Sequence, residues 1–171
     1  KESIGAYYSM GWGTYFAKNN KQAIKRFDEY LSNGGKSKNA ERGKAFALFR
    51  LGKDTEAKPI LEAMIKLEDE KKLLPITEVV PIPNTKKQWT VVYDSRSTLG
   101  WLHYRNKEYD KAMKYFSETI DKYPFLIDAL TGMGYVKLEQ NDKAAAKKYF
   151  QDALKLSPYY PDAKAGLKKA S

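Results

Sequence analysis

Residues 112–124 read AMKYFSETIDKYP and residues 146–158 read AKKYFQDALKLSP, so one pattern recurs 34 positions further along the chain. In both stretches an alanine, a tyrosine–phenylalanine pair and a final proline keep their places. The apolar residues between them recur at offsets that place side chains on one face of an α-helix. A period of this length in helical sequence is typical of a solenoid built from stacked helix pairs.

The repeat extends beyond these two stretches. A glycine upstream of the alanine recurs as Gly100 and Gly134, and in the N-terminal part of the chain Ala23 corresponds to Ala57 at the same shift of 34 residues. The sequence therefore predicts four repeats, at residues 4–37, 38–71, 93–126 and 127–160.

This pattern resembles the tetratricopeptide repeat (TPR), whose units are two antiparallel helices, A and B, joined by a short turn. The shared features are a small residue at position 8, alanine at position 20, a large apolar residue at position 24 and proline at position 32. Positions 8 and 20 are small because helices A and B approach closely there, and the proline ends helix B. The resemblance implies an all-α, TPR-like α-solenoid of four helix-turn-helix repeats, with a non-helical insertion between repeats 2 and 3. The match is poorest in repeat 2, where Pro59 predicts a kinked helix B or a displaced helix start.

The insertion and the tail complete the predicted organisation. Residues 72–92 do not read as helix, because several prolines and β-branched residues favour extended backbone. Residues 88–93 read as a strand, and a hairpin around residues 83–87 is compatible with the prolines only at a sheet edge. The insertion is either a connector that packs Trp89 on the solenoid or a flap over its groove. Residues 161–171 read as the start of a capping or further helix.

Composition restricts the compartment and the chemistry only loosely. The chain has no cysteine, which excludes disulfides and thiolate metal sites without separating cytoplasm from periplasm. No apolar run is long enough to span a bilayer. The chain begins with Lys1 instead of Met and shows no signal-peptide pattern. We therefore expect a soluble mature chain or excised fragment, cytoplasmic or periplasmic.

Catalysis, metal binding and a cofactor are not expected from these residues. The single histidine, His103, falls at a core-facing position and has no histidine or cysteine partner for a metal site. Gly11-Trp-Gly13 lacks the third glycine of a phosphate loop and falls within a predicted helix. No arrangement resembles a catalytic triad. The sequence thus favours a binding protein over an enzyme.

The resemblance also implies where a partner binds, because helix A positions 2, 5, 9, 12 and 13 line the groove in this family. Position 9 is aromatic in every repeat, and arginine occurs at positions 5 and 13. The lysine and asparagine with which some members clamp an acidic C-terminus are absent from positions 5 and 9. The alternative is that aromatic residues at helical spacing pack in the core, Phe46 above all. The implied partner-binding set is Tyr8, Trp12, Tyr15, Arg42, Phe46, Arg50, Trp101, Tyr104, Arg105 and Tyr135.

Several partners are compatible with an aromatic surface edged with arginine. The first hypothesis is a non-catalytic scaffold that binds a protein or peptide, because flat rings give a large contact area at a small entropic cost. The second is a polysaccharide-export or cell-envelope helper that binds an acidic glycan or an export partner. The third is RNA binding, suggested by the net charge of +10, and the fourth is a regulatory domain of a larger enzyme. Lysines interspersed with acidic residues favour an ordinary solvated surface, so nucleic acid is not the expected partner.

Overall fold

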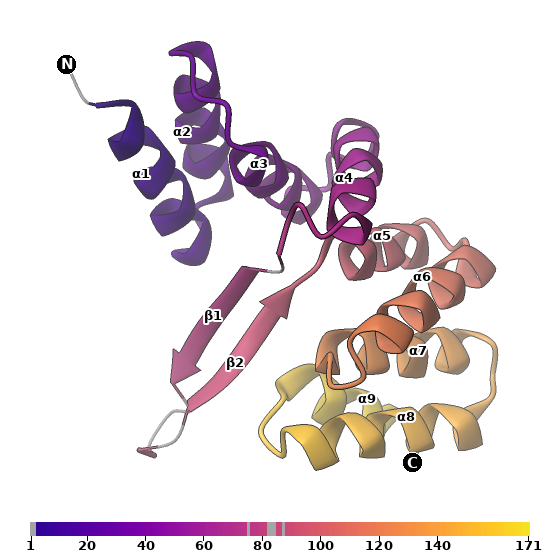
Figure 1. Ribbon diagram of the computed structural model, residues 1–171. Helices are drawn as coiled ribbons and strands as arrows, with labels where there is room; N and C mark the ends of the chain where they lie inside the picture. Colours follow the sequence, from indigo (N-terminus) through magenta and orange to yellow (C-terminus); the bar gives the residue numbers. More distant parts are fainter. Residues whose placement is uncertain (1–2, 75, 82–84, 87) are drawn as a thin grey trace. The chain divides into compact units, whose positions relative to one another are not determined.

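The computed structural model describes residues 3–74, 76–81, 85–86 and 88–171 and divides into two compact units (Figure 1). Unit 1 comprises Lys1–Pro75 and unit 2 comprises Ile76–Ser171. Each unit has its own buried apolar residues. The TPR-like solenoid that the sequence predicts is confirmed in both, and the described residues between the repeats include strands.

Unit 1 consists of two consecutive helix pairs. Helices A of the two repeats begin at Ile4 and Lys38, the first residues of the predicted repeats. Each helix packs against the next one in sequence. The bounds are α1 Ile4–Phe16, α2 Asn20–Ser32, α3 Lys38–Arg50 and α4 Asp54–Asp69.

Unit 2 contains a β-hairpin and five helices in the part of the chain that the structure describes. Helix A of repeat 4 begins at Ile127, the predicted first residue, whereas helix A of repeat 3 begins at Ser95, after its N-cap Asp94. The bounds are β1 Ile76–Pro81, β2 Gln88–Tyr93, α5 Ser95–Arg105, α6 Tyr109–Lys122, α7 Ile127–Glu139, α8 Lys143–Leu156 and α9 Pro161–Ala170.

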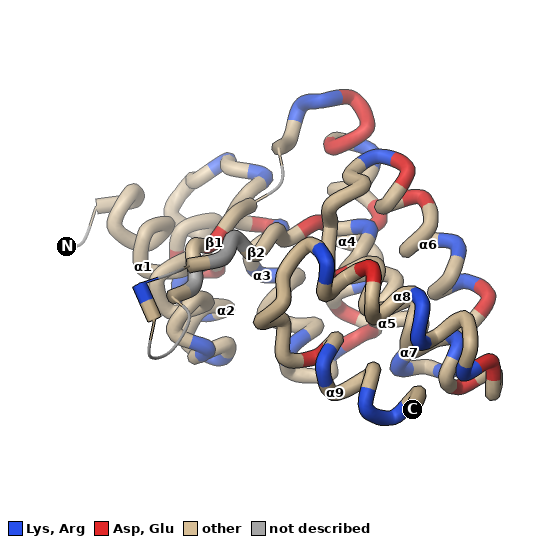
Figure 2. Tube along the Cα trace, turned by 90° about the horizontal axis from the view of Figure 1, so that it is seen from below, with Lys and Arg blue, Asp and Glu red and all other residues tan. Residues whose placement is uncertain are grey.

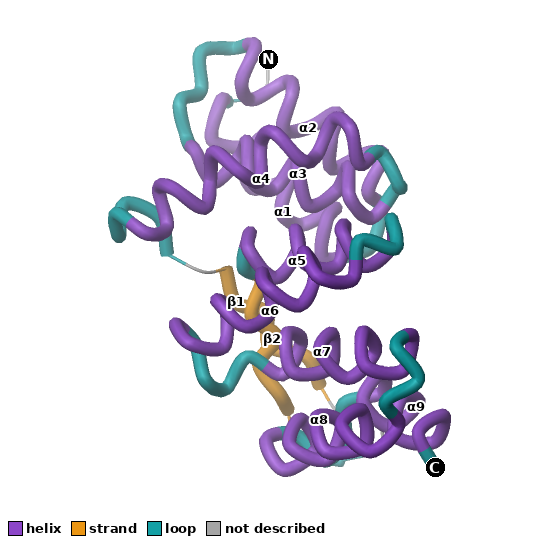
Figure 3. The backbone as a smooth tube through the Cα atoms, turned by 90° about the vertical axis from the view of Figure 1, so that its right-hand side faces the viewer, coloured by secondary structure: helices purple, strands orange, loops and turns teal. Residues whose placement is uncertain are grey.

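The insertion forms an antiparallel hairpin, whose strands are distinct from the helices in Figure 3. Ile76 pairs with Tyr93 at its base, and the Tyr93 hydroxyl donates to the Glu78 carboxylate at 2.5 Å. The predicted turn at residues 83–87 falls largely outside the described residues, as does the side chain of Trp89. The two alternatives for the insertion, connector and flap, therefore both remain predictions.

Pro59 does not displace the start of its helix. Helix α4 begins at Asp54 and continues through Pro59 to Asp69, with Lys53 as the N-cap. Proline lacks the N–H that would bond to the carbonyl one turn earlier, so a single backbone hydrogen bond is lost. Because the proline falls in the second turn and the apolar face is intact, the rest of the helix compensates for it.

The core of each unit is organised around a phenylalanine ring that lies between two glycines. The ring of Phe116 on α6 is so close to α5 and α7 that a Cβ at Gly100 would lie 2.7 Å from its Cε1. A Cβ at Gly132 would lie 2.6 Å from the same atom. Non-bonded atoms do not approach this closely, so an alanine at either position would force the Phe116 ring to move. The Phe116 ring therefore sets the distance from α6, helix B of repeat 3, to the two neighbouring helices A, α5 and α7.

The same arrangement occurs at two further places. Phe27 lies against Gly11 and Gly43, and Phe150 lies against Gly134 and Gly166. In each case one glycine is at position 8 of the same repeat and the other at position 6 of the next helix A. Since Gly166 belongs to α9, this helix packs as the helix A that follows repeat 4.

The junction between repeats 2 and 3 lacks this arrangement. The residue at position 24 of repeat 2 is Leu61, and position 6 of repeat 3 is Thr98 instead of glycine. The break in the glycine pattern coincides with the place where the hairpin enters the chain and where the two units divide.

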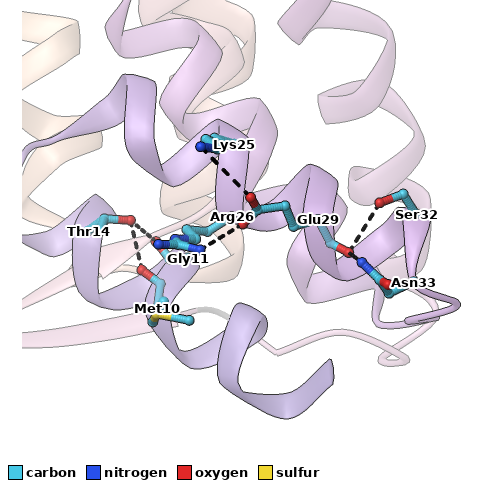
Figure 4. A network of polar contacts seen from close by, with 8 residues as sticks. All are labelled: Met10, Gly11, Thr14, Lys25, Arg26, Glu29, Ser32 and Asn33. Atoms are coloured by element: carbon cyan, nitrogen blue, oxygen red, sulfur yellow. Dashed lines mark hydrogen bonds and ion pairs between the residues drawn. The ribbon is translucent and has the colours of Figure 1, made fainter. Parts of the chain in front are cut away.

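Polar contacts within the first helix pair are local (Figure 4). Thr14 Oγ1 donates to the Met10 carbonyl at 2.7 Å, and Arg26 donates to the Glu29 carboxylate at 2.9 Å. Asn33 Nδ2 donates to the Glu29 carbonyl at 2.7 Å and so satisfies an acceptor at the end of α2. These bonds stabilise α1 and α2 individually, whereas the packing of Phe27 holds the two helices against each other.

Two substitutions in α1 test the glycine requirement directly. Gly11→Ala places a Cβ 2.5 Å from the buried Phe27 ring, whereas Gly13→Ala meets nothing within 4 Å. Overpacking costs about 1–3 kcal/mol and the better helix propensity of alanine offsets about 1 kcal/mol of that cost, so Gly11→Ala should destabilise unit 1 by up to about 2 kcal/mol. Gly13→Ala should stabilise it by about 0.5–1 kcal/mol. Urea unfolding followed by circular dichroism measures both, and equal effects of the two substitutions would contradict the requirement for glycine at position 8.

Candidate partner-binding surface

Three aromatic residues at position 9 contact the inserted phenylalanine rings edge-on. Trp12 and Phe27, and likewise Trp101 and Phe116, have ring centroids 5.3 Å apart and nearly perpendicular planes. Tyr135 lies 5.1 Å from Phe150 in the same orientation. This edge-to-face geometry is favourable beyond simple burial of area. Position 9 is therefore aromatic in these repeats for a structural reason, which leaves only the outer face of each ring for a partner.

In unit 2 the outer faces of such rings are half-exposed and adjoin one another. We call Trp101, Tyr104, Tyr109 and Tyr135 the aromatic cluster. Tyr104 lies 5.5 Å from Trp101, 5.9 Å from Tyr109 and 6.3 Å from Tyr135, measured between ring centroids. All four residues are partly buried. The cluster joins α5, the start of α6 and α7 into one continuous apolar surface.

The polar atoms of the aromatic cluster are directed at acidic groups and carbonyls. The Tyr104 hydroxyl donates to Glu139 Oε1 at 3.1 Å, and the Tyr109 hydroxyl donates to Glu139 Oε2 at 3.3 Å. Tyr135 donates to the Asp162 carbonyl at 3.0 Å. Burial first, and then the Glu139 carboxylate, raise the pKa of Tyr104, so its hydroxyl stays protonated and acts as a donor.

Asp128, the second residue of α7, is bonded to three neutral side chains. Its Oδ2 accepts from Ser97 Oγ at 2.5 Å and from Trp101 Nε1 at 2.9 Å. Its Oδ1 accepts from the Tyr160 hydroxyl at 3.2 Å. Burial raises the pKa of Asp128, and the hydrogen bonds from Ser97, Trp101 and Tyr160 oppose that rise. The carboxylate thereby orients Trp101 at one edge of the aromatic cluster.

Several aromatic residues of unit 1 that were predicted to line the groove are buried instead. Tyr15 is 2% exposed and Phe46 is 1% exposed, with Trp12 close behind at 9%. Their rings contact one another and Phe16, because α1 and α3 pack face to face at this point. These residues belong to the core of unit 1, as the alternative for Phe46 anticipated.

Arg42 is also buried, contrary to its prediction as a groove residue. Its side chain is fully covered and its Nη1 lies 2.8 Å from Oε1 of Glu68, which is equally covered. Its Nη2 donates to Asn39 Oδ1 at 2.7 Å and to the Leu74 carbonyl at 2.5 Å. Helix α4 is long enough to bring Glu68 beneath Arg42, so the arginine holds together α3, the end of α4 and the segment that follows.

The other predicted residues lie nearer the surface. Tyr8 is half-buried with its ring 5.4 Å from Tyr30. Arg50 is half-buried, since its guanidinium lies 3.9 Å from the centre of the Tyr15 ring and donates to the Tyr15 carbonyl. Arg105 is exposed at the end of α5. Of the predicted set, the structure therefore brings Trp101, Tyr104 and Tyr135 together in one place.

His103 is a buried residue of unit 2. It is 2% exposed and its ring stacks on Tyr115 with the planes 4° apart. Its Nδ1 lies 2.5 Å from Glu108 Oε2, and Glu108 also accepts from Lys111 Nζ. The imidazole is thus packed and hydrogen-bonded, as the sequence predicted.

Charged residues occur on most of the helices, whereas α1 carries none (Figure 2). Basic residues outnumber acidic ones in the whole sequence, 31 to 21. Where the structure describes the chain, no group of three or more histidine, aspartate or glutamate side chains is arranged to hold a metal ion. No helix of the described residues is long and apolar enough to cross a membrane.

Sequence reasoning missed the acidic partners of the aromatic cluster. Asp128 stands at position 2 of repeat 4, which is one of the groove positions implied by the resemblance, and Glu139 stands at position 13. Their positions in the repeat could have indicated both residues from the sequence. Tyr109 is the first residue of α6 and Tyr160 precedes α9, and the repeat pattern gives no expectation for either place.

Comparison with known proteins identifies the repeats. Family models described as tetratricopeptide repeat match residues 97–125 and residues 127–160, and the latter range is repeat 4 as predicted. No curated protein sequence matches the chain.

Solved structures share the fold at low sequence identity. The chain is similar to YrrB, described as a TPR protein with an unusual peptide-binding site, with 18% identity and a TM-score of 0.65 over 97% of this chain and 75% of that one. It is similar to PilF of Pseudomonas aeruginosa, with 20% identity and a TM-score of 0.67 over 98% of this chain and 67% of that one. For a thermophilic TPR protein of Thermus thermophilus, TTC0263, the identity is 13% and the TM-score 0.72, over 98% and 81% of the two chains.

The buried ion pair of unit 1 gives a stability prediction. Arg42→Met leaves the Glu68 carboxylate buried without its guanidinium partner, which should destabilise unit 1 by about 3–5 kcal/mol. The double substitution Arg42→Met with Glu68→Met removes both charges and should cost clearly less. Urea unfolding measures the two variants, and a double variant less stable than Arg42→Met would refute this account.

The contacts of Glu108 predict a pH-dependent contribution to stability. Hydrogen bonds from Lys111 and then His103 lower the pKa of Glu108 from 4.5 to about 2. Since the folded pKa lies below the unfolded one, the stabilisation is complete above the unfolded value and is lost as pH falls towards the folded value. The stability difference between wild type and Glu108→Gln should therefore shrink as pH falls from about 5 to about 2.

Thermal unfolding at a series of pH values checks this expectation. Asp121→Asn is the control for net charge. It removes one negative charge, as Glu108→Gln does, but from an exposed position near the end of α6, the helix that Glu108 caps. A difference between wild type and Glu108→Gln that is constant over this pH range would count against the assignment.

Proposed function

Because the chain is a tetratricopeptide-repeat protein, we propose that it is a non-catalytic interaction scaffold that binds a protein or peptide partner on the aromatic cluster of unit 2. The observation that carries the proposal is the continuity of this surface. Trp101, Tyr104 and Tyr135 present adjoining half-exposed rings, and each has its polar atom satisfied from within unit 2. A partner can therefore cover the rings without leaving a buried polar atom unsatisfied.

The chemistry of the surface favours a peptide over a polyanion. Aromatic residues are enriched among those that contribute most to binding energy at protein interfaces. Here the surrounding acceptors are Glu139 and Asp128. These two carboxylates disfavour phosphate groups and acidic sugars at their own contacts, whereas the Lys169 ammonium lies 5.5 Å from the centre of the Tyr135 ring. The solved TPR protein with a described peptide-binding site, YrrB, supports the same choice by analogy of fold.

Selection of short random peptides displayed on phage, with the full chain as bait, tests the proposal. Tyr104→Ser removes one ring from the middle of the aromatic cluster and should weaken the selected peptides by about tenfold or more. Tyr149→Ser is the matched control, because this half-buried tyrosine lies on helix B of repeat 4, outside the aromatic cluster. Isothermal titration calorimetry measures the affinities.

Fluorescence of a single tryptophan compares the classes of partner. Trp12→Phe with Trp89→Phe leaves Trp101 as the only indole. Selected peptides should shift its emission, whereas an acidic oligosaccharide and a single-stranded RNA should not. Failure to enrich any peptide, or equal losses in Tyr104→Ser and Tyr149→Ser, would overturn the proposed function.

A further inference from the structure

A pocket in unit 2 lies beside the aromatic cluster, and its lining includes Asp128, the residue that orients Trp101. Its apolar wall comes from the end of β2, the connection between α6 and α7, and the first residue of α7. Its polar groups are the side chains of Asp128 and Tyr160. The lining residues are Val91, Val92, Phe125, Leu126, Ile127, Asp128 and Tyr160.

One wall of the pocket is unusually apolar for a surface position. Phe125 is 73% exposed, although its neighbour Leu126 is buried in the core. Val91 and Val92 are only partly covered. An exposed ring and two partly exposed valines beside a carboxylate form an amphipathic site, with apolar surface at its mouth and a negative charge further in.

The carboxylate in the pocket has no cation in the described part of the chain. The hydrogen bonds of Asp128 come from Ser97, Trp101 and Tyr160, all of them neutral donors. No lysine or arginine nitrogen of the described residues lies within ion-pair distance of it, and the charge that acts on it is that of Asp162, which is also negative. The first turn of α7 offsets part of this unfavourable charge, since a helix N-terminus stabilises an anion.

The two carboxylate oxygens of Asp128 accept different numbers of hydrogen bonds. Oδ2 accepts two hydrogen bonds, from Ser97 and Trp101, whereas Oδ1 accepts one, from Tyr160 at 3.2 Å. A carboxylate oxygen can accept two, so Oδ1 has capacity for a further donor. Tyr160 and Asp128 both line the pocket, so that donor can approach from the pocket side.

We propose that this pocket receives a lysine or arginine side chain of the partner peptide, a step that rests on the proposed function of the aromatic cluster. The methylene groups of such a side chain pack on Phe125 and the valines, and its cationic end reaches Asp128 Oδ1. Lysine and arginine combine an apolar stem with a charged end, which is the pattern of this pocket. The contact also supplies the countercharge that Asp128 lacks, and hydrogen bonds between charged groups are stronger than neutral ones.

The net charge of +10 does not conflict with a cationic ligand. Charges more than about 8 Å away are largely screened at physiological ionic strength. At contact distance the groups nearest to the ligand matter more than the net charge, and in this pocket they include the Asp128 carboxylate. The Asp128 carboxylate disfavours an acidic side chain at this pocket.

The experiment uses the peptides selected on the full chain. In each peptide the basic residues are replaced one at a time by methionine, which keeps the apolar stem and removes the charge. One replacement should weaken binding to wild type by about tenfold or more. The same replacement should cause little further loss in Asp128→Asn. This variant keeps an oxygen for Ser97 and Trp101 and presents an amide donor in place of Oδ1.

A second variant and its control change residues that lie outside α7. Phe125→Ser removes the exposed wall of the pocket and should weaken the same peptides several-fold, whereas Leu156→Ser, at an exposed apolar position of α8, should not. Selected peptides without a required basic residue, or equal losses from the methionine replacement in wild type and in Asp128→Asn, would overturn the inference. The proposed function would survive that result, provided that Tyr104→Ser still weakened binding, and it fails separately if no peptide is enriched.

Discussion

The insertion of a phenylalanine ring between two glycines is the constraint on which the rest of this structure depends. The ring of Phe116 can contact both neighbouring helices A only because Gly100 and Gly132 carry no side chain. Each insertion fixes one helix B against its own helix A and against the next one. Within each unit, consecutive repeats are thus joined by the same contact, as expected for an architecture in which each repeat touches its neighbours alone.

The same constraint limits where a partner can bind. Each inserted ring needs an aromatic neighbour at position 9, so Trp101 and Tyr135 are first of all packing residues. What distinguishes the two units is the covering of their outer faces. In unit 1 the neighbouring rings and Arg50 enclose Tyr15, whereas the corresponding Tyr104 of unit 2 stays half-exposed and bonds to Glu139. The same packing pattern therefore leaves aromatic rings accessible only where no further side chains cover them.

The chemistry of that surface is set by a few acidic residues in a basic chain. Glu139 and Asp128 satisfy the hydroxyl and indole groups of the aromatic cluster. The Lys169 ammonium lies over the Tyr135 ring, 5.5 Å from its centre, so both signs of charge border the cluster. Overall charge is a guide to long-range attraction, but at contact distance the nearest groups decide which partner is favoured. This difference separates the peptide proposal from an interpretation based on composition.

The sequence by itself determined the repeat, its helix pairs, the non-helical insertion and the packed role of His103, because period, small residues and helix-ending prolines are local signals. Only the tertiary structure decided which members of the predicted surface are exposed. Tyr15, Phe46 and Arg42 occupy the same repeat positions as accessible residues elsewhere, but they are buried by partners distant in sequence, such as Glu68. Exposure depends on what covers a residue from the next layer, and a periodic pattern carries no information about that layer. The glycines at position 6 and the pairing of Asp128 with Tyr160 required the structure for the same reason.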